Sequence, residues 1–204
     1  MLHPNRSPLA SLLAAFLFAM LGLAGTAQAQ MSYTGTVGGG AVSGSGVLSG
    51  GTMSFGTLAL PADINFGDIL APNPGSTAVA YTDTWNFSFS QAASGGGSVT
   101  GDALWLKNFT LTGIIDNVTV RDVTTNATIF TTTLPNALAT GFYVGMATPG
   151  DLYALSITSS VPAGAAVASY TGVFLAQAVP EPGAWLLMAA GLAVLATGLR
   201  SRRR

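Results

Sequence analysis

The side chains of this chain that could do acid–base, nucleophilic or metal chemistry are almost all aspartates. Cysteine is absent, and the only histidine is His3, which lies in an N-terminal segment that we expect to be removed. Ser-His and Cys-His nucleophilic sites and zinc sites with histidine or thiolate ligands therefore lack the residues they need in the mature chain. What remains is carboxylate chemistry.

The carboxylates show no spacing typical of a catalytic pair. A glycosidase needs two acids with separate roles. The body of the chain offers seven scattered aspartates, Asp63, Asp68, Asp83, Asp102, Asp116, Asp122 and Asp151. The only glutamate, Glu181, stands near the C terminus. We therefore expect a protein that is not an enzyme and that holds no cofactor or metal.

One short segment, DINFGD at 63–68, has some of the polar spacing of a calcium loop. Asp63, Asn65 and Asp68 would supply oxygen ligands, but the further acids and the closing glutamate of an EF-hand are missing. A turn with solvated acids is the preferred interpretation, and a calcium loop is the alternative.

Asp83 is the unusual member of the stretch YTDTWNFSF. In a strand, Tyr81, Asp83, Trp85, Phe87 and Phe89 fall on one face and should point inward. A buried carboxylate needs hydrogen bonds or an ion pair. We expect Asp83 to accept hydrogen bonds from backbone amides or an aromatic hydroxyl, with a metal or sugar contact as the alternative.

The remaining body also reads as β-structure. Thr, Val and aromatic residues alternate in seven predicted strands, at 54–60, 78–91, 103–115, 117–123, 127–134, 151–161 and 167–177. Gly, Pro, Asn and Asp predict turns at 71–76, 94–97, 148–151 and 162–165. The Gly- and Ser-rich segment 30–51 is interpreted as short edge strands. Seven or eight antiparallel strands predict a single β-sandwich or jelly-roll-like domain over residues 30–178.

The net charge of the body argues against nucleic acid and anionic lipid as binding partners. Seven aspartates against two bases, Lys107 and Arg121, give the body a net charge of −5. Nucleic-acid binding needs a basic surface, so no nucleic-acid partner is expected. The same charge disfavours adsorption to anionic lipid, and without cysteine no disulfide can form.

The N terminus resembles a secretory signal peptide. Arg6 precedes an apolar run from Leu9 to about Ala24, and Ala27 and Ala29 occupy the −3 and −1 positions before Gln30. Residues 1–29 are therefore predicted to be cleaved by signal peptidase. An uncleaved membrane anchor is the alternative, and both interpretations place the body outside the cytoplasm.

The C terminus has three consecutive parts. Val179, Pro180, Glu181 and Pro182 form an extended stem, because proline fixes φ and removes amide donors. Residues 184–199 carry no charge and predict a short transmembrane helix. Trp185 would mark one interface, and four arginines would hold the other end in the cytoplasm: Arg200, Arg202, Arg203 and Arg204.

This order of motif, apolar helix and terminal arginines, over residues 179–204, resembles the PEP-CTERM sorting signal. The resemblance implies recognition by an exosortase, a membrane-embedded protease that resembles a transpeptidase. It also implies transit through the inner membrane and delivery to the cell envelope or exterior, in bacteria that form biofilms and secrete polysaccharide. The stretch YTDTW resembles the FxDxF group of PEP-CTERM proteins, with Tyr81 and Trp85 in place of both phenylalanines.

Two functions of different class follow from these features. The first is a non-enzymatic matrix or surface protein, exported and processed through its C-terminal signal. The alternative is a carbohydrate-binding module for extracellular polysaccharide, with exposed aromatic residues such as Trp105 or Tyr143 stacking on sugar rings.

Overall fold

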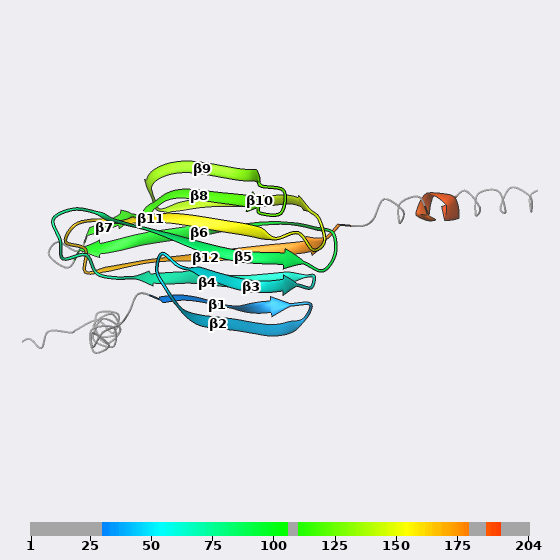
Figure 1. Ribbon diagram of the computed structural model, residues 1–204, viewed down its shortest axis with the longest axis horizontal. Coiled ribbons are helices and arrows are strands. Elements are labelled where there is room, and N and C mark those ends of the chain that lie inside the picture. Colours follow the sequence, from blue (N-terminus) through cyan, green and yellow to red (C-terminus); the bar gives the residue numbers. More distant parts are fainter. Residues whose placement is uncertain (1–29, 106–109, 180–186, 193–204) are drawn as a thin grey trace, which may run out of the picture.

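The computed structural model describes residues 30–105, 110–179 and 187–192. Over these ranges the chain forms twelve β-strands in two sheets (Figure 1). In chain order the strands are β1 (Gln30–Val37), β2 (Gly40–Leu48), β3 (Thr52–Leu58), β4 (Ala62–Leu70), β5 (Val79–Phe89), β6 (Ala93–Trp105), β7 (Thr110–Gly113), β8 (Ile115–Asp122), β9 (Ala127–Ala137), β10 (Ala139–Ala147), β11 (Tyr153–Val161) and β12 (Val167–Ala178).

The larger sheet has seven strands in the order β10-β6-β12-β4-β1-β2, with β7 also pairing with β6. The smaller sheet has five strands in the order β3-β5-β11-β8-β9. The strands of both sheets run along the long axis of the molecule (Figure 1). The prediction of an all-β sandwich is therefore confirmed. The expectation of purely antiparallel pairing is wrong at one place, because β3 runs parallel to β5.

Alternation of buried and solvent-facing side chains explains why the central strands form where they do. Along β11 every second residue, from Tyr153 to Val161, is buried. In β5 the same pattern buries Asp83, Trp85, Phe87 and Phe89, as the sequence predicts. Period-two alternation of this kind suits a sheet with one face on a core and one on solvent.

Aromatic rings from both sheets fill the space between them. Phe174 of β12 lies 4.9 Å from Phe87 of β5, centroid to centroid, and stacks on Phe142 of β10 at 6.2 Å and 5°. Phe66 of β4 also lies 5.1 Å from Trp85 of β5, so this pair crosses between the sheets as well. Such pairs add about 0.5–1.5 kcal/mol each beyond their buried area. The cross-sheet rings therefore bind the two layers together.

Glycines of the larger sheet make room for these rings. Three aromatic residues stand opposite a glycine of the neighbouring strand: Tyr33 opposite Gly44, Phe66 opposite Gly172, and Phe142 opposite Gly97. A Cβ on Gly44 would lie 2.5 Å from the Tyr33 ring, and one on Gly97 would lie 2.9 Å from the Phe142 ring. Part of the high glycine content therefore serves packing within strands and not turns.

We expect Gly172→Ala to lower the free energy of unfolding by about 1–3 kcal/mol, because its methyl group would overlap the Phe66 ring and overpacking forces side chains off their rotamers. Urea denaturation followed by tryptophan fluorescence measures the effect. The matched control is Gly141→Ala, whose Cβ meets only the Gly97 carbonyl oxygen at 3.6 Å and should change stability by less than about 0.5 kcal/mol. Equal stability of the two variants would contradict this packing role.

Most of the predicted strands correspond to observed ones, and the predicted turns at 71–76, 148–151 and 162–165 lie between strands. The segment 103–115 is not one strand, because β6 ends at Trp105 and β7 begins at Thr110. The predicted turn at 94–97 is wrong, because these residues lie inside β6. The predicted turn at 63–68 is also wrong, because it lies inside β4.

Both ends of the chain carry predictions that fall largely outside the described residues. These are the signal peptide 1–29 with Ala27 and Ala29, the stem residues Pro180, Glu181 and Pro182, the interfacial Trp185, and the terminal Arg200, Arg202, Arg203 and Arg204. Of the predicted transmembrane helix 184–199, residues 187–192 are described and helical. Their apolar side chains, among them Leu187 and Leu192, are exposed. In the described part of the chain, no helix is both long and apolar enough to cross a membrane.

Candidate functional site

A buried polar cluster lies between the two sheets, centred on Asp83 of β5. The amide of Gly50 donates to Asp83 Oδ1 at 2.6 Å, and the hydroxyl of Tyr170 donates to Asp83 Oδ2 at 2.6 Å. The indole Nε1 of Trp85 donates to the Tyr170 hydroxyl at 3.2 Å. Asp83 is 0% exposed and Tyr170 1%. Both kinds of partner expected for Asp83, a backbone amide and an aromatic hydroxyl, are present.

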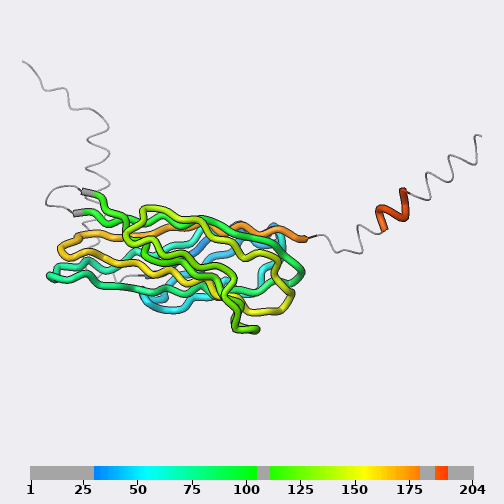
Figure 2. Tube along the Cα trace, turned by 90° about the horizontal axis from the view of Figure 1, so that it is seen from above, coloured from blue at the N-terminus to red at the C-terminus, as the bar shows by residue number. Residues whose placement is uncertain are grey.

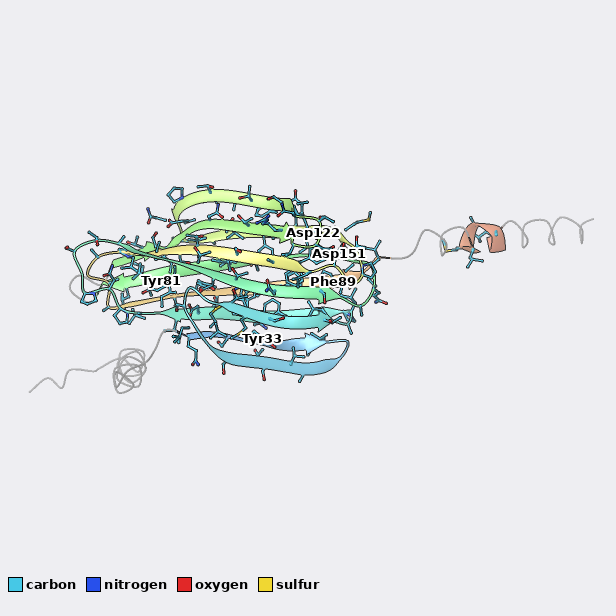
Figure 3. The ribbon with its side chains drawn as sticks, in the orientation of Figure 1. Tyr33, Tyr81, Phe89, Asp122 and Asp151 are labelled. Carbon is cyan, nitrogen blue, oxygen red and sulfur yellow. The ribbon has the colours of Figure 1, made fainter. Side chains whose placement is uncertain are left out.

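Three elements position this cluster. Asp83 and Trp85 point inward from alternate positions of β5, and Tyr170 points inward from β12 in the opposite sheet. Gly50 lies in the turn between β2 and β3, where its φ of +78° turns the amide toward Asp83. Glycine adopts such a positive φ without steric strain, because it has no Cβ. Tyr81, two residues before Asp83, lies toward the opposite end of β5 from Phe89 (Figure 3).

The phenol of Tyr170 is a donor throughout the ordinary pH range. Burial, and after it the charge of Asp83, raises the pKa of Tyr170 above its usual value of 10.0. A protonated phenol donates to a carboxylate and accepts from the Trp85 indole, which completes a chain of donors ending at Asp83. Each oxygen of Asp83 therefore accepts one hydrogen bond inside the sandwich.

A second carboxylate, Asp68 of β4, belongs to the same cluster. It stands opposite Tyr170 in the β4–β12 pairing and is 2% exposed. Neither of its oxygens has a hydrogen-bond partner, and the same holds for the buried hydroxyl of Ser49 nearby. Burial first, and then the neighbouring Asp83, raises the pKa of Asp68 to about 7, although proximity to Ser49 lowers it.

The raised pKa of Asp68 predicts a loss of stability as pH rises, in a buffer without divalent cations. The folded state holds a proton up to about pH 7, whereas the unfolded chain releases it near its ordinary pKa of 3.8. Stability should therefore be greatest below about pH 4, fall between about pH 4 and pH 7, and level off above. The urea midpoint measured from pH 4 to pH 8 shows this. Asp68→Asn should flatten the profile, and an unchanged slope in that variant would contradict the assignment.

The alternative interpretation of residues 63–68, a calcium loop with Asp63, Asn65 and Asp68 as ligands, is wrong. Strand β4 places Asp63 and Asn65 on the exposed outer face and Asp68 on the inner face. Side chains on opposite faces of one strand cannot ligate one ion. Asp68 instead lies near Asp83 in space. Along the chain a loop separates the two residues, and they belong to different sheets.

Sequence reasoning missed Asp68, Ser49, Gly50 and Tyr170 as members of the cluster. A signal for Asp68 was present, because it continues the inward series of Ile64 and Phe66 in the way that Asp83 continues the series of β5. Tyr170 and Gly50 carried no such signal, since their roles depend on which strands and turns come together.

The outer faces of the sandwich carry few charged side chains and are rich in hydroxyl groups. On the smaller sheet, cross-strand hydrogen bonds join Thr82 to Thr158 at 3.1 Å and Thr119 to Thr131 at 3.1 Å. On the larger sheet, a shallow depression of about 500 Å³ lies over β1, β4, β6 and β12. Its outward side chains include Ser32, Thr34, Asn65, Ser98, Thr100 and Thr171.

Exposed aromatic side chains do not form a stacking platform within the described residues. Tyr143 is 54% exposed, but it packs edge-on against Phe130 at 5.1 Å and 66°. No other aromatic side chain among those that the structure describes is exposed. The side chain of Trp105, the other candidate, lies outside the described set.

Other acids of the body serve turns or lie apart from the cluster. Asp122 accepts a hydrogen bond from the Thr125 amide at 3.0 Å, and this bond lowers the pKa of Asp122. It lies at the end of β8, near Asp151 (Figure 3). No group of three or more His, Cys, Asp or Glu side chains in the described ranges is arranged to hold a metal ion.

The junction between the body and the C-terminal stem is well defined. Strand β12 lies between β4 and β6 in the larger sheet and ends at Ala178, at one tip of the sandwich (Figure 2, orange). The amide of Val179 then donates to the Ala92 carbonyl at 3.0 Å. The body is therefore hydrogen-bonded up to the first residue of the stem.

Three kinds of known protein were compared with this chain: curated sequences, solved structures and protein families. No curated protein sequence matches this chain. One solved structure with a similarity is the pre-peptidase C-terminal domain of a collagenase from Bacillus anthracis, at 15% identity and a TM-score of 0.32, over 60% of this chain and 93% of that one. A family model described as the PEP-CTERM protein-sorting motif matches residues 178–204. The chain therefore carries a PEP-CTERM protein-sorting motif at its C terminus, directly after the last strand of a β-sandwich.

Proposed function

We propose that this protein is a non-enzymatic component of the cell envelope or extracellular matrix, sorted through its C-terminal signal by an exosortase. The observation that carries the proposal is the sorting motif at residues 178–204. Such a motif goes with export and with membrane anchoring in transit. Because the stem begins at Val179, after the end of β12, a cut within it would leave all twelve described strands in the processed body.

The membrane step follows from the composition of the tail. A helix over 184–199 would be about 24 Å long at 1.5 Å per residue, a minimal span for a bilayer core of about 30 Å. Arginine side chains after it would remain at the cytoplasmic interface. The prolines at Pro180 and Pro182 would keep the segment outside the membrane extended, and proteases bind extended segments.

A structural role for the body is supported by where its carboxylates lie. Asp68 and Asp83 are enclosed between the sheets, away from any substrate in solution. The outer faces instead present hydroxyl groups in cross-strand pairs, such as Thr84 with Ser156 at 3.3 Å. A hydroxyl-rich surface with few charged groups suits contact with hydrated polymers in a matrix. The FxDxF-like stretch supplies the aspartate at the centre of the core, and that subgroup assignment is part of the proposal.

The sorting step is tested by replacing Pro180, Glu181 and Pro182 with alanine in a host that contains an exosortase. We expect the variant to stay in the membrane fraction at its unprocessed mass, whereas the unaltered protein is processed. The matched control is the pair Ser76→Ala and Thr77→Ala in an exposed loop, which should be processed normally. Normal processing of the triple variant would overturn the proposal.

A carbohydrate-binding module is the second candidate, and the depression on the larger sheet is the observation that favours it. Its hydroxyl and amide groups, such as Asn65 and Thr100, could hydrogen-bond to sugars. The lack of paired exposed aromatics among the described side chains weighs against it. A glycan array that includes envelope polysaccharides tests it. Binding that is weakened by Thr100→Val would support the module, and no binding to any glycan would dismiss it.

A further inference from the structure

The buried cluster between the sheets holds two carboxylates and no positive charge that the structure describes. We propose that Asp68 and Asp83, with the hydroxyl of Ser49, bind a divalent cation of the calcium class inside the sandwich. This inference is independent of the sorting proposal, because it concerns only the folded body. It also differs from the calcium loop considered for 63–68, since its ligands come from β4, β5 and the β2–β3 turn.

Unpartnered polar atoms are the first support. Asp68 is 2% exposed, and both its oxygens lack a hydrogen-bond partner, as does the buried Oγ of Ser49. Buried polar groups are nearly always paired, because an unpaired one loses the hydrogen bonds that it made with water. An ion among these atoms would use all three oxygens together.

Charge is the second support. Of the basic residues, the described ranges contain only Arg121, which donates to Asn126 in the exposed turn between β8 and β9. Both hydrogen-bond donors to Asp83, the Gly50 amide and the Tyr170 hydroxyl, are neutral, so no described cation is paired with it. Buried charges are ordinarily paired or bound to metal. A cation is the partner that this carboxylate pair lacks.

The chemistry of the donors selects the class of cation. All candidate ligands are hard oxygens, which calcium and magnesium prefer over zinc or copper. Calcium accepts irregular geometry with six to eight ligands, whereas magnesium demands a near-regular octahedron. Only two carboxylates contribute, so the affinity should be modest, in the range of about 10⁻⁴–10⁻³ M that is typical of extracellular modules.

The test uses the full-length protein in detergent and compares its melting temperature in EDTA with that in about 10 mM CaCl₂, roughly tenfold above the weaker end of that range. We expect calcium to raise the melting temperature by a few degrees, because a ligand that binds only the folded state stabilises it. Asp68→Asn should abolish this rise. Asp63→Asn, on the outer face of the same strand, is the matched control and should retain it. NaCl at equal ionic strength should not reproduce the rise.

A second measurement reports the position of the ion. Terbium, which occupies calcium sites, should emit when Trp85 is excited, because the indole is one hydrogen bond from Tyr170 and two from Asp83. Emission should be displaced by calcium and lost in Asp68→Asn. The proposal is overturned if calcium leaves the melting temperature unchanged, if Asp63→Asn loses the effect as Asp68→Asn does, or if Asp68→Asn is the more stable protein in calcium. The last result would show that the site holds only a proton.

Discussion

Replacing Phe174 with alanine should lower the free energy of unfolding by about 3–5 kcal/mol, the range for Phe→Ala in protein cores. Phe174 is 0% exposed and lies where rings from both sheets meet. It packs against Phe87 and Phe89 of β5 and against Phe142 of β10, with centroid distances of 4.9, 6.3 and 6.2 Å. Because these rings belong to different strands, the surrounding chain cannot easily collapse into the cavity.

The control for Phe174→Ala is Leu175→Ala, the next residue of β12, which faces outward and is 50% exposed. Urea denaturation should show a loss of less than about 1 kcal/mol for this variant, because little apolar area leaves the core. Losses of similar size for both residues would mean that the alternation along β12, and with it the packing of the two sheets, is wrong.

Replacing Asp83 with alanine should lower the free energy of unfolding by about 3 kcal/mol when measured in EDTA. The substitution leaves the Tyr170 hydroxyl and the Gly50 amide without an acceptor, and each buried unpaired group costs about 1–3 kcal/mol. Relief of repulsion on Asp68 offsets part of this loss. Asp63→Ala, at an exposed position of β4, should change stability by less than about 0.5 kcal/mol.

A double-mutant cycle isolates the bond between Asp83 and Tyr170. If the two groups stabilise each other through their hydrogen bond, Tyr170→Phe should cost less in the Asp83→Ala background than alone. Strict additivity of the two substitutions would contradict the 2.6 Å bond. Chemical denaturation of the four proteins gives the cycle.

The sequence predicts those parts of the fold that a single strand determines. The side chains of β5 alternate in burial from Tyr81 to Phe89, so both the strand and the inward position of Asp83 follow from local pattern. The segment 94–97 shows the limit of such reasoning. Three consecutive glycines are typical of a turn, but Gly97 lies in β6, where the Val173 backbone of β12 and the Phe142 ring of β10 leave no room for a side chain. A glycine that serves a ring from another strand has no local signal.

The candidate site was predictable to the same extent. A buried carboxylate must accept hydrogen bonds. The sequence therefore predicts that Asp83 accepts from a backbone amide or an aromatic hydroxyl. The identities of Gly50 and Tyr170 do not follow, because a turn and a strand distant in sequence supply them. The short polar spacing of Asp63, Asn65 and Asp68 favours a turn with solvated acids, so the sequence places Asp68 in solvent. Strand β4 separates them by face.

The sorting signal needed no three-dimensional information, because its parts follow one another along the chain. A proline-containing stem, an apolar segment and terminal arginines act through order and spacing. For that reason the export of this protein follows from its sequence more directly than any activity of its body does. The fold contributes the position of the junction, at the end of a central strand.

The intact mass of the protein recovered from a host that contains an exosortase tests the sorting proposal most directly. We expect a chain that begins at Gln30 and ends within or near the stem 179–182, with the apolar segment and the arginines removed. The same gene in a host without the enzyme should give a chain that retains them. Recovery of the complete C terminus from both hosts would contradict the proposal.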